Sequence, residues 1–187
     1  MRIISEWHGS DKAHTIEEVA TTLAFNSWKI GLKAVKSMQD EKLYFVSKSQ
    51  GLLVIAEFII FQIQVADRLA YSRMNEQERT HFIQVFAKNC LQNLSDNRKE
   101  LGGKDEEKKD YIAEFSNIFN ERLSEYADFT FDEVDGPSYR FYRYLGEKVG
   151  LIMGNDQDNK WAIDQVMDIE APGAYEDIRK SMDMLYG

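Results

Sequence analysis

A chain of 187 residues, 43% of them hydrophobic, can bury a substantial core, which excludes an intrinsically disordered protein. The 32 acidic residues against 23 basic ones give a formal net charge of −9, which disfavours binding to nucleic acid and to anionic membrane surfaces. A single cysteine, Cys90, cannot form an internal disulfide, and the first residues lack the apolar run of a secretory signal. We therefore expect a soluble protein of the cytoplasm.

The pattern of apolar residues predicts an all-α protein. Only two prolines interrupt the sequence, and no segment alternates apolar and polar residues over the length of a strand. The length fits one domain covering residues 1–187. The expected architecture is a single-domain helical bundle of five to seven helices, with an antiparallel hairpin over residues 49–101 at its centre.

The first helix is expected to begin at Thr15, because Thr15 and Glu18 have the spacing of a capping box. Apolar residues then recur at helical spacing along one face. A second apolar set, formed by Phe25, Trp28 and Leu32, points to the opposite side of the same helix. Either other helices sandwich this one, or its second face contacts a partner, for which a second copy of the chain is the simplest choice.

The most apolar stretch runs from Gly51 to Arg73 and predicts a helix buried in the middle of the bundle. Polar residues interrupt this stretch, which argues against a membrane span. Ser47 or Ser49 can cap the start of the helix. The segment just before it, at 43–46, is expected to be either a short extended piece or an apolar loop that packs under the bundle.

The third helix is predicted to follow the second almost at once. Asn75 and Glu78 have capping-box spacing, with asparagine in place of serine or threonine. Gly102 and Gly103 supply a C-terminal stop. The charged run that follows makes residues 102–110 a possible flexible connection.

The C-terminal half predicts further helices separated by turns. A fourth helix is expected to end near Asp128, and turn residues around Gly136 and Pro137 precede a fifth. A short sixth helix follows Gly154. The pair Pro172 and Gly173 is expected to break the helical pattern before a final amphipathic segment.

The central helix carries polar residues on one side. Glu57, Gln64, Arg68 and Tyr71 fall within a sector of roughly 60° of the helix circumference. This polar seam either faces water or forms a groove between helices in which these groups orient a small ligand. Asp67 lies outside the seam and, if buried, needs a cationic or hydrogen-bonding partner from another element. These five residues are the candidate ligand-binding set.

A second candidate site involves metal ligands. Glu78 and His81 have the E-x-x-H spacing that places two ligands on one helix face, and Glu57 on the preceding helix could be a third. Bundles that bind iron or manganese use two such pairs, and this sequence has only one. The alternative is a solvated helix start in which Glu78 acts only as a cap.

No complete catalytic set and no phosphate-binding glycine loop occurs in the sequence. The leading hypothesis is therefore a binding or assembly protein that is not an enzyme. The first alternative is a helical bundle that binds a metal ion or small ligand through carboxylates and histidine. The second alternative is a carrier of an apolar ligand, because abundant Phe and Met can surround a hydrophobic molecule.

Overall fold

The computed structural model describes residues 14–102, 110–154 and 159–186, so the predicted connection at 102–110 lies almost wholly outside them. A two-stranded antiparallel ladder joins β1 (Phe131–Asp132) to β2 (Gly136–Pro137). All other regular elements are helical. In chain order they are α1 (Ile16–Asp40), α2 (Lys48–Tyr71), α3 (Glu76–Gly102), α4 (Tyr111–Ala127), α5 (Tyr139–Met153), α6 (Asn159–Gln165), the π-helical turn η2 (Val166–Glu170) and α7 (Ala171–Tyr186).

The expected all-α bundle is confirmed, because α6, η2 and α7 follow one another without a break and the described residues thus form six continuous helical segments. The predicted central hairpin corresponds to α2 and α3. Helix α2 is buried along almost its whole length and contacts α1, α3, α4, α5 and α7. No helix in the described part of the chain has the length and apolarity required to cross a membrane.

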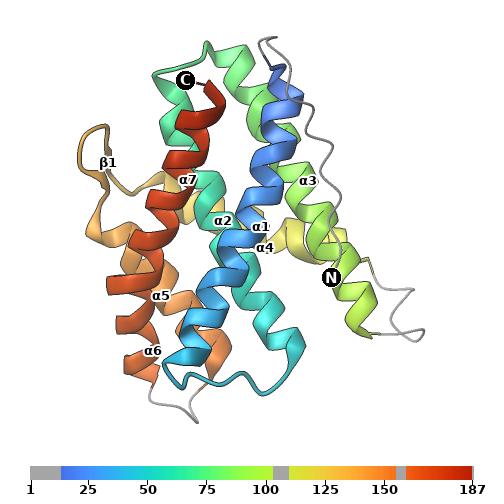
Figure 1. Ribbon diagram of the computed structural model, residues 1–187, viewed down its shortest axis with the longest axis vertical. Helices are drawn as coiled ribbons and strands as arrows, with labels where there is room; N and C mark the ends of the chain where they lie inside the picture. The colour runs from blue at the N-terminus through green and yellow to red at the C-terminus, as the bar shows by residue number, and fades with distance from the viewer. Residues whose placement is uncertain (1–13, 103–109, 155–158, 187) are drawn as a thin grey trace.

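Helix α1 lies between α7 and α3 in Figure 1, and it also packs on α2. Trp28 is only 2% exposed, while Phe25 and Leu32 are half-buried. The second apolar face of α1 is thus covered largely by other helices of the same chain, which is the first of the two alternatives above. Trp28 belongs to the core and is not available to a partner.

The side-chain caps that the sequence predicts are present at the starts of three helices. Thr15 and Glu18 form both bonds of a capping box at α1. Ser47, not Ser49, caps α2 by accepting the backbone N–H of Gln50. The Asn75 and Glu78 side chains bond reciprocally to each other's backbone N–H at the start of α3.

The turn between α1 and α2 is an irregular loop that packs on the bundle only in part, because Leu43 is buried and Phe45 half-buried while Tyr44 and Val46 are exposed. Lys42 adopts φ 67°, and the N–H groups of Lys42 and Leu43 donate to the carbonyls of Gln39 and Met38. This is the Schellman arrangement, with lysine at the position that glycine usually occupies. Leu43 is buried, so the loop is anchored to the core.

The predicted break at Pro172 is wrong, since the helix continues through it. The π-turn ends at Glu170, two residues before the proline, and the Ala171 N–H donates to the carbonyl of Val166, five residues earlier. In a regular α-helix the proline ring would collide with the carbonyl of the residue four positions before it, here Asp168. The wider π-turn takes up this conflict locally.

Candidate functional site

Helix α4 runs across the back of the bundle, transverse to the other long helices, and an ion pair with α2 holds it there (Figure 1). The Arg122 Nε lies 3.1 Å from both carboxylate oxygens of Glu57, and Nη2 lies 3.0 Å from Oε1. The Glu57 side chain is 4% exposed and that of Arg122 13%. The carboxylate is therefore almost fully enclosed, and a bidentate arginine is its partner.

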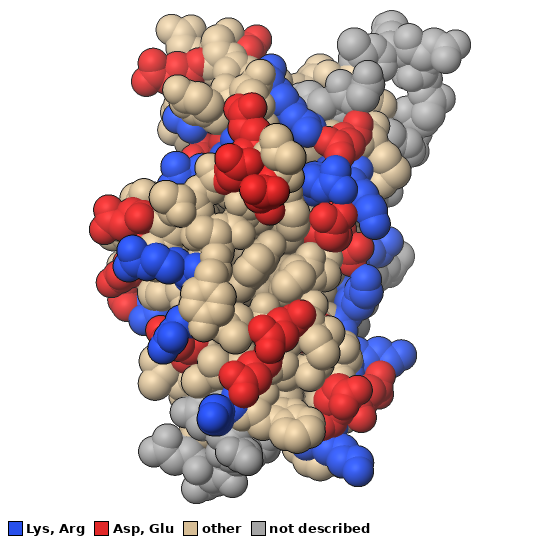
Figure 2. Space-filling model, turned by 90° about the vertical axis from the view of Figure 1, so that its left-hand side faces the viewer, with Lys and Arg blue, Asp and Glu red and all other residues tan. Residues whose placement is uncertain are grey.

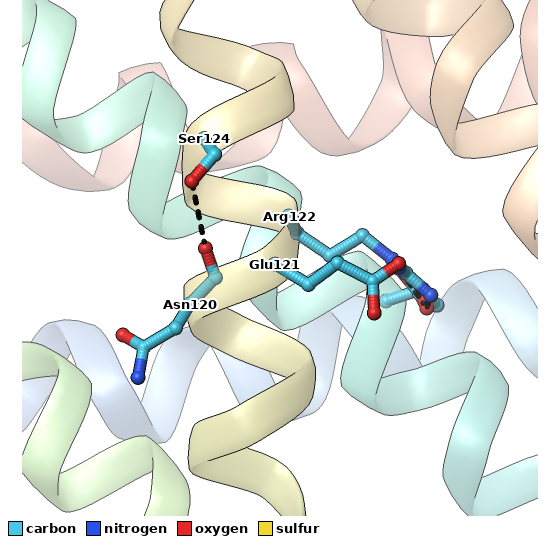
Figure 3. A network of polar contacts seen from close by, with 5 residues as sticks. Asn120, Glu121, Arg122 and Ser124 are labelled. Carbon is cyan, nitrogen blue, oxygen red and sulfur yellow. Dashed lines mark hydrogen bonds and ion pairs between the residues drawn. The ribbon is translucent and has the colours of Figure 1, made fainter.

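Other polar groups surround this pair. Glu121 forms a second ion pair with Arg122, and Figure 3 shows both side chains extending to the same side of α4 while Asn120 points away. The Tyr126 and Tyr144 rings pack edge to face, 4.9 Å between centroids, and the buried Tyr126 hydroxyl has no hydrogen-bond partner among the described residues. These groups and the ion pair form one polar cluster, which reaches from the buried tyrosines and Glu57 to the exposed Glu121 at the surface.

Burial controls the protonation of the cluster. Loss of solvation raises the pKa of the Glu57 carboxyl, and the hydrogen bond and charge of Arg122 oppose this rise. Burial also raises the pKa of Tyr144 to about 12 and that of Tyr126 well above its ordinary value. Both phenols therefore stay neutral at physiological pH.

The rest of the polar seam also lies largely within the fold. Gln64 is 4% exposed, and Arg68 is half-buried with its Nη2 3.3 Å from the carbonyls of Tyr126 and Ala127. These carbonyls are at the negative C-terminal end of α4, where a cation is stabilising. Tyr71, at 71% exposure, reaches solvent. The contacts seen for Glu57 and Arg68 thus fasten α4 to α2, and a ligand-binding role for the seam stays a prediction.

Asp67 has a partner from another element, as expected. The Arg79 Nη1 of α3 lies 3.5 Å from its Oδ1, and both side chains are about a third exposed. The same guanidinium lies over the Tyr71 ring, 5.2 Å from the centroid. The pair therefore joins the two helices of the central hairpin near their turn.

Each of the three candidate metal ligands bonds to a different partner in the structure. Glu57 bonds to Arg122, Glu78 caps α3, and the His81 Nε2 lies 2.7 Å from Oε1 of Glu17 on α1. Within the described ranges, no three His, Cys, Asp or Glu side chains are grouped so that they could hold a metal ion. Binding of iron or manganese here would require these side chains to leave their present partners.

A pocket of about 300 Å³ opens at the end of the bundle where α1 and α3 finish and α2 begins. This volume is at the lower end of the range of ~300 to 1,000 Å³ for small-molecule sites. Most of its wall is apolar, and three polar side chains lie in it. The lining residues are Val35, Gln39, Phe45, Ser47, Lys48, Gly51, Leu52, Ile55 and Leu101.

Hydrogen bonds hold the loop side of this pocket in place. The Gln50 Oε1 accepts the Val46 N–H at 2.7 Å, and its Nε2 donates to the Ile152 carbonyl of α5 at 2.8 Å. Gly51 keeps the wall open, because an added Cβ would meet only the Phe45 ring, at 4.0 Å. The pocket is thus formed by fixed backbone together with a glycine that leaves space.

The pocket residues are not those singled out from the sequence, although two signals pointed to this region. One is the apolar loop at 43–46, and the other is a glycine in the first turn of the most apolar helix. Chemically, the pocket can enclose an apolar molecule and present an ammonium, a hydroxyl and an amide to it. Comparison of the chain with protein-family models, with curated proteins and with solved structures found no match.

Proposed function

We propose that this protein is a non-enzymatic binding protein whose ligand is a small, mostly apolar molecule held in the pocket between α1, α2 and α3. The observation that carries this proposal is the pocket itself, with Val35, Leu52 and Ile55 on its wall. Each methylene of a ligand that leaves water for such a wall contributes about 0.8 kcal/mol. About ten buried methylenes therefore correspond to the roughly 8 kcal/mol of micromolar affinity, before the cost of immobilising the ligand.

The experiment is native mass spectrometry of the full chain, followed by extraction and identification of retained molecules. Gly51→Leu places a branched side chain where the wall is now open, so this variant should lose the ligand. Gly173→Leu is the matched control, because Gly173 is an exposed glycine in α7 with open space around it. Equal retention by wild type and Gly51→Leu would refute binding in this pocket.

A second candidate function is assembly with a protein partner or another copy of the chain. Figure 2 looks onto the side formed by α5, α6 and α7, where uncharged side chains cover much of the middle. Leu151 of α5, Trp161 of α6 and Ile169 of η2 are 70%, 53% and 56% exposed. Exposed large apolar side chains of this kind are typical of interaction surfaces when they gather into a patch.

Sedimentation velocity over a range of concentrations tests self-assembly. Trp161→Glu should shift the chain toward the monomer if this side forms the contact. Leu123→Glu, on α4, is the control, because Leu123 is also a partly exposed apolar residue. A chain that stays monomeric at high concentration would leave no support for the homodimer.

A further inference from the structure

Lys48 supplies a positive charge to an otherwise apolar pocket. Lys48 lines the pocket and is exposed to solvent. It forms no ion pair with any other described residue. Its methylenes can lie along the wall while the ammonium stays at the opening. The chain as a whole carries a formal charge of −9, which repels anions. The unpaired ammonium of Lys48 beside the cavity is therefore the group that would attract an anionic ligand.

The start of α2 adds to this positive potential. Ser47 and Gly51 of the first turn also line the pocket, and this turn contains no acidic residue. The backbone N–H groups of Lys48 and Ser49 donate to no other described residue. The Ser47 Oγ accepts the Gln50 N–H, which leaves its own hydrogen free to donate. Unpaired N–H groups and the helix dipole favour negative charge here.

The end of α1, which reaches the same pocket through Gln39, does not cancel this effect. A helix C-terminus is negative because its last carbonyls lack partners. Here the carbonyls of Ser37, Met38 and Gln39 accept N–H groups from Glu41, Leu43 and Lys42. The loop thus satisfies the end of α1, while the start of α2 keeps free donors.

We infer that the ligand is a single-chain amphiphile with a carboxylate head group, such as a medium-chain fatty acid. The inference rests on the proposed function, since it requires that the pocket binds a ligand. The head group is held by Lys48, the Ser47 hydroxyl and the first turn of α2. The tail lies between Val35, Leu52 and Ile55 and the Phe45 ring.

Isothermal titration calorimetry of the full chain with decanoate and with decanol tests the head-group assignment. The two probes share a tail and differ in charge, so decanoate should bind about five- to tenfold more tightly, the range expected for a charge-assisted hydrogen bond that is partly exposed to water. Lys48→Met should reduce this ratio below about threefold, leaving decanol affinity unchanged. Lys42→Met, in the neighbouring turn, is the charge-matched control and should keep the ratio.

The outcomes separate the inference from the proposed function. Tight binding of both probes with no preference for decanoate, together with loss of both in Gly51→Leu and Val35→Phe, overturns the carboxylate assignment alone. Absence of binding by the wild type, or binding that persists in both blocking variants, overturns the pocket proposal and the inference together. Shortening decanoate to octanoate should weaken binding by about fourfold per methylene removed, because each methylene contributes about the same transfer free energy.

Discussion

Replacing Arg122 by methionine should remove the partner of an enclosed carboxylate while keeping a long apolar side chain. Glu57 would lose three hydrogen bonds of 3.0 to 3.1 Å at a site where its side chain is 4% exposed. Breaking a buried ion pair from one side costs about 3 to 5 kcal/mol. We therefore expect the free energy of unfolding at neutral pH to fall by about that amount, a large part of the stability of an ordinary domain.

The loss should depend on pH. Burial already raises the pKa of Glu57 in the folded chain, and removal of Arg122 takes away the group that opposes this rise. A carboxyl whose pKa is higher when folded is protonated more readily in the folded state. The stability that this pKa difference contributes is fully present below the unfolded pKa of about 4.3. It is lost as the pH rises through the folded pKa. Arg122→Met should thus regain stability relative to wild type as the pH falls from neutral toward about 4.3.

Urea unfolding followed by far-ultraviolet circular dichroism at several pH values measures both effects. Adding Glu57→Gln to Arg122→Met removes the titrating carboxyl, so the double variant should be more stable than Arg122→Met at neutral pH and show the same pH dependence as wild type. Arg143→Met is the control, because its pair with Glu147 is exposed and should contribute less than about 1 kcal/mol. An Arg122→Met variant within 1 kcal/mol of wild type at neutral pH would refute the assignment.

Three further predictions concern backbone conformation and thiol chemistry. Lys42→Gly should raise the free energy of unfolding by up to about 1 kcal/mol, because φ 67° is strained for lysine and natural for glycine; no gain in urea unfolding would contradict this. Gly136→Ala should destabilise by more than about 1 kcal/mol, since φ is 79° and the added Cβ would lie 2.5 Å from the Tyr175 Cζ; an unchanged midpoint would show that the turn can shift. Cys90 should react with a thiol reagent only in denaturant, because it is 1% exposed and burial raises its pKa; rapid reaction of the folded chain would show local opening.

Local rules predicted most of the helices. The caps at Thr15, Ser47 and Asn75 depend on residues within four positions of one another, so spacing alone reveals them. The length and apolarity of α2 likewise indicated a central helix. Such features need no knowledge of the tertiary contacts.

Features that depend on distant partners were not predictable in the same way. The sequence marked Glu57 as unusual, yet its partner Arg122 is 65 positions away on a transverse helix. The second face of α1 suggested a partner chain because periodicity does not distinguish between helices of the same chain and another molecule. The pocket was missed because its wall combines two helix ends, a loop and a third helix.

The π-turn at Val166–Glu170 has a consequence for insertions and deletions. Ala162 and Val166, the first residue of this turn, are buried and four positions apart, whereas the hydrogen bond from the Ala171 N–H to the Val166 carbonyl spans five positions. One extra residue therefore rotates everything that follows by about 100°, and this rotation brings Ile178 and Met182 onto the core. Removing a single exposed residue from this turn would leave the composition of α7 intact but change which of its sides faces the bundle. The helix accommodates Pro172 only together with this rotation of the residues that follow.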